Sequence, residues 1–491
     1  MAGIGFEIKK LFKKEGIFNT VFAGLHATAV TIGPMVIVII ALNVMYMMQP
    51  YIELAYKDKE ILSSTILYVF IFALILASPV NIILSRYIAD RIYEENYKEI
   101  FVAVEAGAFI IALCVAAVGI PFGYLMYETG GLPLYYVFAA YVFFAGVTFT
   151  FYYMNFITVL KQYGKITYSF IGSLIVGVLF VTVSRQFFNV AISDAILFGL
   201  AIGFSMIAIF LLTFMRLSFR ERSYNYRLLI DCCKKNKWLV LANFLYMIGL
   251  YIHNFVFWFK SDYKVVVMKI FFCAPNYDMA TYLAMLSNIS ILVIFTVNVE
   301  TKFHMAYKAY CESIIGAAGK EMKKAKQKMI ETLRRETIYI IQLQVIINLT
   351  AYIIAQIFFP RLGVEGDILS MYPVLSVGYM ILYLIQCFMI YLFYFDDVSG
   401  AVLTGLIFLT GNLFGSMVSV NFSPYLSGLG LVFGSSCGMT FIFFRLRYKM
   451  LHLDRHIYGR GEIVKKVSRR KRSDIVTVYS FAERNKGGGS Y

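Results

Sequence analysis

Long, almost uninterrupted apolar segments recur from one end of the chain to the other. A helix of about 20 residues crosses the ~30 Å hydrocarbon core of a bilayer, and each segment reaches or approaches that length. The pattern predicts about twelve transmembrane helices. Their cores lie at 17–48, 61–84, 101–124, 133–160, 166–184, 191–215, 238–259, 277–298, 338–359, 370–394, 400–420 and 426–444.

These segments are expected to be helices and not the strands of a barrel. A barrel strand alternates apolar and polar side chains, whereas residues 36–42 are apolar at every position. Within lipid a helix satisfies all its backbone hydrogen bonds internally. The predicted fold class is therefore an all-α polytopic membrane protein.

The order of spans and polar segments predicts two six-helix lobes. Ile4, Ile8, Leu11 and Phe12 recur at helical spacing between lysines, which is typical of a helix lying in the membrane interface. The predicted organisation is an amphipathic interfacial helix at 1–16, an N-terminal lobe at 17–215, a cytoplasmic linker at 216–237, a C-terminal lobe at 238–444 with a cytoplasmic helical insert at 299–337, and a basic cytoplasmic tail at 445–491.

Composition supports the membrane class, and the distribution of charge predicts its orientation. Apolar residues make up 60% of the chain and charged residues only 15%, with a net charge of +16. Most Lys and Arg residues fall into alternate connections, and such basic connections face the cytoplasm. Both termini are therefore predicted to be cytoplasmic. Attraction to anionic lipid headgroups explains this charge without nucleic acid as a partner.

Ionisable side chains inside predicted spans are candidates for a transport path, because they are costly to bury in lipid. Four such residues are Glu105, Asp278, His26 and His253. Glu105 could instead reach back to the interface or pair with a basic group. The histidines could be packing residues with satisfied hydrogen bonds.

The span 133–160 carries a second candidate path. Tyr141, Thr148, Tyr152 and Asn155 share one helix face with Phe144. Aromatic rings there could stack on sugars while hydroxyl and amide groups bind sugar hydroxyls. Helix packing and membrane-interface belts are the alternative roles of such a stripe.

Two basic segments are candidates for docking a partner. The insert 299–337 is longer than a connection needs, and it could either extend the flanking helices or bind a soluble protein. The tail could bind lipid headgroups. The candidate side chains are Lys323, Lys324, Lys326 and Lys328 in the insert and Arg469, Arg470, Lys471 and Arg472 in the tail.

No metal site, cofactor or enzymatic activity is expected. The seven cysteines and five histidines show no ligand-like spacing. The sequence contains no nucleotide-binding Gly-rich loop, and the predicted outside loops are too short for a catalytic domain.

Several short motifs resemble the PelG family of membrane-embedded exopolysaccharide export subunits. The N-terminal run MAGIGFE is the most specific, and Gly33-Pro34 supports it. Further matching runs are RYIADRIY at 86–93, YFDD at 394–397 and LDRH at 453–456. The first of these runs adds Arg86 and Asp90 to the path candidates. After the acidic pair, Val398-Ser399-Gly400 departs from the family pattern, in which a basic residue is expected.

This resemblance implies a function and a set of partners. It implies a fold of the polysaccharide flippase and multidrug exporter superfamily in a bacterial cytoplasmic membrane. The cargo would be a nascent polysaccharide rich in galactosamine and N-acetylgalactosamine. The implied partners are a cytosolic glycosyltransferase that uses UDP-N-acetylgalactosamine, a cyclic-di-GMP receptor subunit and a small membrane scaffold subunit.

Two other functions remain open. A flippase for lipid-linked oligosaccharides would alternate its access instead of holding a continuous path. A scaffold would organise the synthase subunits and conduct nothing.

The predicted topology can be tested with single cysteines introduced into a variant that lacks the seven native ones. Positions 128, 226 and 325 lie in different predicted connections. A membrane-impermeant maleimide should label position 128 from outside intact cells and positions 226 and 325 only after lysis. The reverse pattern would refute the predicted orientation.

Overall fold

The computed structural model describes residues 38, 41, 56–94, 96–159, 163–188, 190–219, 226–260, 262–316, 319–358, 360–362 and 366–453. The predicted interfacial helix at 1–16 lies outside these residues. The first predicted span also lies outside them, apart from Val38 and Ala41.

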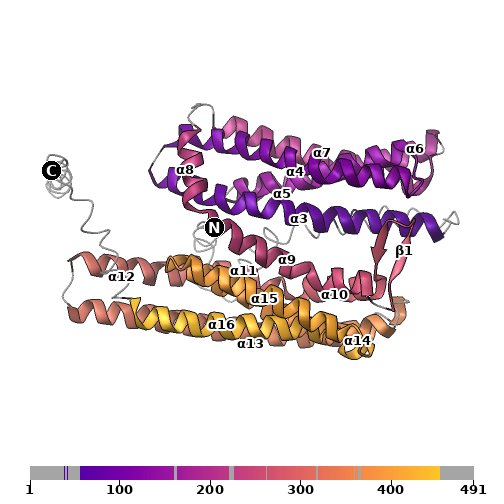
Figure 1. Cartoon of the computed structure of the whole chain (residues 1–491). Helices are drawn as coiled ribbons and strands as arrows, with labels where there is room; N and C mark the ends of the chain where they lie inside the picture. Colours follow the sequence, from indigo (N-terminus) through magenta and orange to yellow (C-terminus); the bar gives the residue numbers. More distant parts are fainter. Residues whose placement is uncertain are drawn as a thin grey trace. The chain divides into compact units, whose positions relative to one another are not determined.

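The described part of the chain contains eleven helical segments that are long and apolar enough to cross a membrane. They coincide with eleven of the predicted spans, which confirms the helical membrane class. The spans are α3 (Tyr56–Tyr93), α4 (Ile100–Glu128), α5 (Leu134–Val159), α6 (Tyr163–Phe188), α7 (Ile192–Ser218), α9 (Lys237–Lys260), α10 with α11 (Pro275–Asn288 and Ser290–Asn298), α13 (Gly319–Phe358), α14 (Gly366–Tyr394), α15 (Val398–Ser419) and α16 (Leu429–Leu451) (Figure 1).

The connections carry structure that the hydropathy pattern does not indicate. Two three-residue strands form an antiparallel β-hairpin between α9 and α10. The span at 277–298 is divided at Ile289 and continues through a π-helical turn into a further helix. The connecting elements are η1 (Tyr97–Glu99), α8 (Arg227–Lys235), β1 (Val265–Val267), β2 (Phe271–Cys273), η2 (Val299–Phe303), α12 (His304–Gly316), η3 (Pro360–Leu362) and η4 (Pro424–Leu426).

Consecutive spans run in opposite directions, so their connections alternate between two ends of the helix bundle. We call the end that carries β1 and β2 the hairpin end. The opposite end carries α8, α12 and the beginning of α13, and we call it the basic end because it holds the lysine-rich stretch of α13.

Residues Met1–Ile442 form one compact unit and Phe443–Tyr491 a second, which contributes only the end of α16 and the two residues after it to the described part. Within the first unit, α5 packs against α3, α4 and α7, and α7 packs against α6. Further along the chain, α9 packs against α15, α10 against α14, and α12 against α13. We refer to α3–α7 as the first helix group and to α9–α15 as the second.

Small residues let the helices within each group approach closely. A Cβ atom on Gly249 of α9 would lie 2.6 Å from the Phe408 ring of α15, and one on Gly146 of α5 would lie 2.9 Å from the backbone nitrogen of Ser205 in α7. Asn412 strengthens the α9–α15 contact because its amide donates to the Gly249 carbonyl at 2.8 Å. Both groups therefore hold their helices at near-backbone distance.

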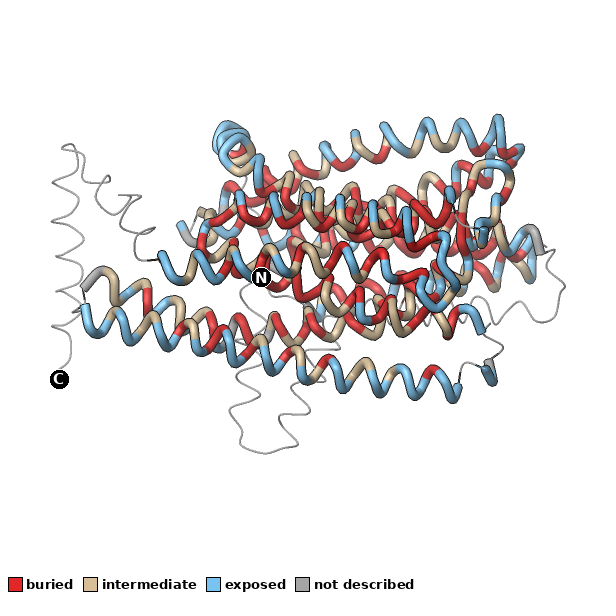
Figure 2. The backbone as a smooth tube through the Cα atoms, turned by 60° about the horizontal axis from the view of Figure 1, so that its bottom comes forward, coloured by how far each residue is buried: buried red, intermediate tan, exposed pale blue. Residues whose placement is uncertain are grey.

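The helices differ widely in how much protein surrounds them (Figure 2). In the most apolar 18-residue window of each helix, 67% of α14 is buried but only 17% of α13. Apolar side chains such as Ile346, Leu349 and Ile353 are exposed on α13. This apolar surface is the one that lipid or another membrane subunit would cover.

Candidate transport site

Helices α3 and α9 bring the two groups together, and we call their contact the seam. Toward the basic end, the Asn243 amide donates to the Ser78 carbonyl at 3.0 Å and also binds the Ser78 hydroxyl. Toward the hairpin end, the rings of Tyr68 and Trp258 stack with centroids 4.9 Å apart. A polar cargo that passes between the groups would meet amide, hydroxyl and aromatic groups here, which together suit carbohydrate.

Asp278 lies beside the seam in the first turn of α10, where sequence analysis placed a path candidate. Its carboxylate accepts hydrogen bonds from Asn254 Nδ2 at 2.8 Å, Trp258 Nε1 at 2.9 Å and the Ala274 backbone nitrogen at 3.0 Å. These donors belong to α9 and to the residue that precedes α10. Asp278 therefore holds the Trp258 indole in the position in which it stacks on Tyr68.

Asn254 is left with an unused acceptor. Its amide nitrogen faces Asp278, so its Oδ1 atom points away, and this buried oxygen has no partner among the residues that the structure describes. Turning the amide over would oppose two oxygens, so the arrangement is fixed by Asp278. Sequence analysis missed both Asn254 and Trp258 because neither side chain is ionisable.

His253 is enclosed in the second group between two tyrosines. Its Nδ1 atom lies 2.8 Å from the Tyr277 hydroxyl and its Nε2 atom 3.2 Å from the Tyr379 hydroxyl. The residue is fully buried. In this conformation both ring nitrogens are used in helix packing, and a role in a path remains a prediction.

The stripe on the span 133–160 lies on α5 and faces α3 and α4. The Tyr152 hydroxyl donates to the Val104 carbonyl of α4 at 2.8 Å, and the Asn155 amide donates to Ser85 of α3 at 2.6 Å. Thr148 is fully buried and bonds within its own helix, while Tyr141 lies against Gly119 of α4. These contacts pack the first group, so a carbohydrate path along this face stays a prediction that needs another conformation.

Glu105 differs from Asp278 in its surroundings. It is half-buried on α4, and no hydrogen bond or ion pair joins it to another residue in the described ranges. Arg86 and Asp90 lie near the basic end of α3 and form an exposed i,i+4 pair at 3.5 Å. In the part of the chain that the structure describes, neither Asp278 nor the Arg86–Asp90 pair forms a hydrogen bond or ion pair with Glu105.

A polar network that the sequence analysis did not single out joins three spans where α10 ends and α11 begins. Gln344 of α13 donates to Asn288 at 3.1 Å and to Asn348 at 2.9 Å, and it accepts from Ser290 at 2.6 Å. Asn288 also donates to Ser376 of α14 at 3.1 Å. The sequence signal that could have identified this network is the pair of amide side chains Gln344 and Asn348, which lie four residues apart in an apolar segment. The network joins the two halves of the divided span to their neighbours.

At the basic end, α12 and the first part of α13 pack as an antiparallel pair. The ammonium group of Lys302 lies 2.8 Å from the buried carboxylate of Glu336. Lys323, Lys324 and Lys328 are exposed beyond this ion pair, and Lys326 is half-buried. The predicted cytoplasmic insert is therefore helical and continuous with the membrane spans.

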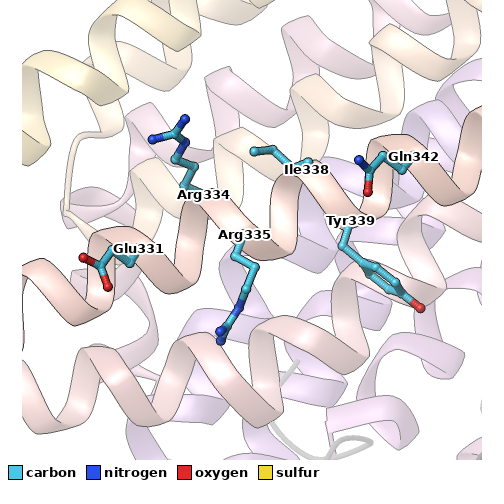
Figure 3. Close-up of a pocket in the computed structure, with 6 residues that line it drawn as sticks. All are labelled: Glu331, Arg334, Arg335, Ile338, Tyr339 and Gln342. Atoms are coloured by element: carbon cyan, nitrogen blue, oxygen red, sulfur yellow. The ribbon is translucent and has the colours of Figure 1, made fainter.

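A surface pocket of about 460 Å³ lies along α13 near this ion pair. Its described lining comes from one helix, and Figure 3 shows Arg334 and Arg335 pointing in opposite directions. Such a surface does not enclose a ligand. The lining residues are Glu331, Arg334, Arg335, Ile338, Tyr339 and Gln342.

Some predicted residues cannot be placed. His26 and the four tail residues Arg469, Arg470, Lys471 and Arg472 lie outside the described residues. Within the described ranges, no group of three or more His, Cys, Asp or Glu side chains could hold a metal ion.

The fold is similar to that of solved multi-helix membrane transporters, including the following three. An inward-facing multidrug resistance MATE family transporter of the MOP superfamily is 13% identical, with a TM-score of 0.56 over 84% of this chain and 99% of the other. An outward-facing one is 12% identical, with a TM-score of 0.58 over 88% and 96%. A MOP superfamily transporter from Pyrococcus furiosus is 12% identical, with a TM-score of 0.61 over 88% and 96%. At these identities the likeness concerns the fold alone.

The chain belongs to the family described as "PelG: Putative exopolysaccharide Exporter (EPS-E)", which matches residues 1–458. The resemblance found in the short motifs is thereby confirmed. No curated protein matches the sequence. The family and the fold together describe a multi-pass membrane protein for polysaccharide export.

The contrasting surroundings of Glu105 and Asp278 predict opposite effects of neutral substitutions. Asp278→Asn should lower the stability of the folded protein by about 1–3 kcal/mol, because an amide cannot accept from all three donors. Glu105→Gln should leave stability unchanged and reduce export, because a path residue contacts cargo and not its neighbours. Thermal melting in detergent and secreted polymer measure the two effects. Equal loss of folded protein in both variants would contradict the assignment of Glu105 to a path.

Proposed function

We propose that the chain is the transmembrane subunit of a synthase complex and exports a nascent galactosamine- and N-acetylgalactosamine-rich exopolysaccharide, Pel, across the bacterial cytoplasmic membrane. Its membership of the exopolysaccharide exporter family over residues 1–458 carries this proposal. The helical transporter fold supports it.

The seam is the proposed route for the polysaccharide. Sugar hydroxyls need hydrogen-bond partners within the membrane, and Ser78 and Asn243 lie opposite each other on α3 and α9. Trp258 and Tyr68 offer ring faces on which sugars stack. The two rings now cover each other, so the route requires the groups to separate.

Movement of the two helix groups is the proposed mechanism. The fold resembles both an inward-facing and an outward-facing MATE family transporter. In this chain, the contacts within each group include close backbone approaches, of Gly146 to Ser205 in the first and of Gly405 to Ala242 in the second. The seam contacts described above all involve a side chain: Asn243 on Ser78 and Trp258 on Tyr68. Each group would therefore move as a body, and their separation would open a continuous path along the seam.

The proposed partners bind the basic end. A cytosolic glycosyltransferase that uses UDP-N-acetylgalactosamine would dock on α12 and α13 and deliver the growing polymer to the seam. A cyclic-di-GMP receptor subunit and a small membrane scaffold subunit would complete the complex. The exposed lysines of α13 suit an acidic surface on the glycosyltransferase.

A lipid-linked oligosaccharide flippase is the second candidate function. The stacked rings of Tyr68 and Trp258 favour it over a permanently open channel, because a flippase alternates its access. A non-conducting scaffold is the third candidate, in which the chain would recruit the synthase subunits alone.

Inside-out membrane vesicles that contain the synthase complex can separate these functions. With radiolabelled UDP-N-acetylgalactosamine supplied outside, export should place polymer in the lumen, where an added glycosidase cannot digest it. Polymer that forms but remains fully digestible would indicate the scaffold. Luminal label that extracts into organic solvent as short lipid-linked chains would indicate the flippase. Vesicles without this chain provide the baseline.

Reversing the charge of Lys323, Lys324, Lys326 and Lys328 to Glu should reduce copurification of the glycosyltransferase in detergent. Insertion should be normal, because the apolar spans determine it. The matched control reverses Lys260, Lys264 and Lys269 at the hairpin end, which should leave copurification unchanged. If the α13 variant also retains the enzyme, this helix is not its docking surface.

A further inference from the structure

The β-hairpin connects α9 to α10, two helices of the second group, but its hydrogen bonds to Tyr68 and Ser64 join it to α3 of the first group. It leaves α9 at Lys260 and returns into α10 at Pro275, with Val266 paired to Phe272 across its two strands. Its second strand and its turn lie against α3 and α4. The hairpin therefore bridges the two groups at the hairpin end of the seam.

A single hydroxyl provides the principal polar fastening. Tyr68 of α3 donates to the Phe272 carbonyl at 2.9 Å and accepts from the Phe272 backbone nitrogen, also at 2.9 Å. One turn earlier on α3, Ser64 accepts from the Cys273 thiol at 3.4 Å. The backbone carbonyl and the backbone N–H of Phe272 are thus both hydrogen-bonded to the Tyr68 hydroxyl.

Apolar side chains of the hairpin also pack against the first helix group. Phe271 is fully buried, and its ring lies 5.2 Å from that of Tyr68 and 5.6 Å from that of Phe122 on α4. The Ile270 side chain lies against Gly130, just beyond α4, where an added Cβ would come within 2.8 Å of it. The hairpin consequently covers the end of the seam that the Tyr68–Trp258 stack occupies.

The turn of the hairpin is held in a strained conformation. Met268 and Lys269 have φ angles of 51° and 61°, in the left-handed region that non-glycine residues avoid. They are the first two of the three residues that connect Val267 to Phe271, and two successive positive φ angles in a hairpin turn normally fall on Asn-Gly or Asp-Gly. Strain of this kind persists where surrounding contacts enforce it, and it is common in segments that switch.

We propose that this hairpin is a gate over the seam and that the Tyr68 hydroxyl holds it shut; the proposal rests on the transport function proposed above. Cargo leaving the seam at this end must pass Phe271 and Cys273. The fastening consists of hydrogen bonds and ring contacts, so it can detach while both helix groups stay folded. Asp278 acts as a positioning residue, since it holds Trp258 against the ring of Tyr68.

Cys273 is a native reporter of the gate. It is the last residue of β2, its side chain is buried against Ser64 of α3, and burial raises the pKa of its thiol to about 12. Maleimides react with the thiolate and must reach it from solvent, so Cys273 is labelled slowly while the gate is shut, whereas a cysteine already beside it at position 64 needs no such access. Opening exposes it.

Covalent locking is the first test. Ser64→Cys, combined with serine at Cys114, Cys232, Cys233, Cys311, Cys387 and Cys437, places two thiols where an oxygen and a sulfur now lie 3.4 Å apart. Oxidation should form a disulfide with Cys273, removing two hydrogens to the added oxidant. Export in the vesicle assay should then fall to the level without this chain and recover when a reductant cleaves the bond.

The matched control adds Cys273→Ser to the same variant, so that no disulfide can form and the oxidant should leave export unchanged. A disulfide that forms without affecting export would overturn the gate while leaving the transport function intact. Failure of the disulfide to form would show that the hairpin does not rest on Ser64, which also overturns the proposal.

Labelling of native Cys273 is the second test, and it requires no transport. In detergent, with the other six cysteines replaced, Tyr68→Phe should increase the rate of N-ethylmaleimide labelling at Cys273, because the ring stack remains but both bonds to Phe272 are lost. Tyr135→Phe is the control: it removes a bond to Asp194 within the first group and should not change that rate. Equal rates in the two variants would contradict the role of Tyr68. This assay needs no cargo, so it tests whether Tyr68 holds the hairpin shut even if the vesicles show no export.

Discussion

Hydrocarbon offers no hydrogen bonds, and this constraint explains how several of the polar side chains in the spans are paired. The Asp278 carboxylate collects three donors, the His253 ring lies between two hydroxyls, and Gln344 bonds to both halves of a divided helix. Each arrangement ties one helix to another at a fixed distance. The polar residues therefore specify which helices belong together, while the apolar residues supply the area of contact.

The strength of these ties differs between the interior of each group and the seam. Within a group, glycines permit near-backbone contact, and separating the helices would leave amides without partners. At the seam, the stacked rings of Tyr68 and Trp258 can part without breaking a hydrogen bond between them, and the Asn243–Ser78 bonds are the polar contacts described there that would have to break. The plane between α3 and α9 is consequently where the two helix groups would separate in the proposed mechanism.

Hydropathy predicted the spans well because the signal is local: twenty apolar residues in sequence suffice, whatever they touch. The hairpin was not predicted, since each strand has only three residues and its stability comes from Tyr68, which lies 204 residues away. Asp278 was identified as an unusual charge, but its binding to Trp258 depends on how α9 and α10 meet. The helical face of Tyr141, Thr148, Tyr152 and Asn155 was recognised from spacing, and only three-dimensional packing showed that it contacts α3 and α4 in this state.

Helix α13 contrasts with the divided span that precedes it. Its 40 residues extend about 60 Å, twice the thickness of the hydrocarbon core, without a break. Because the helix is unbroken, a displacement of its lysine-rich half is transmitted along the helix to the half that contains Gln344. The interruption at Ile289 gives the neighbouring span a joint instead. A movement of the lysine-rich half of α13 would thus displace Gln344. Through the bonds of Gln344 to Ser287 and Ser290, it would also displace the two helices that meet at Ile289.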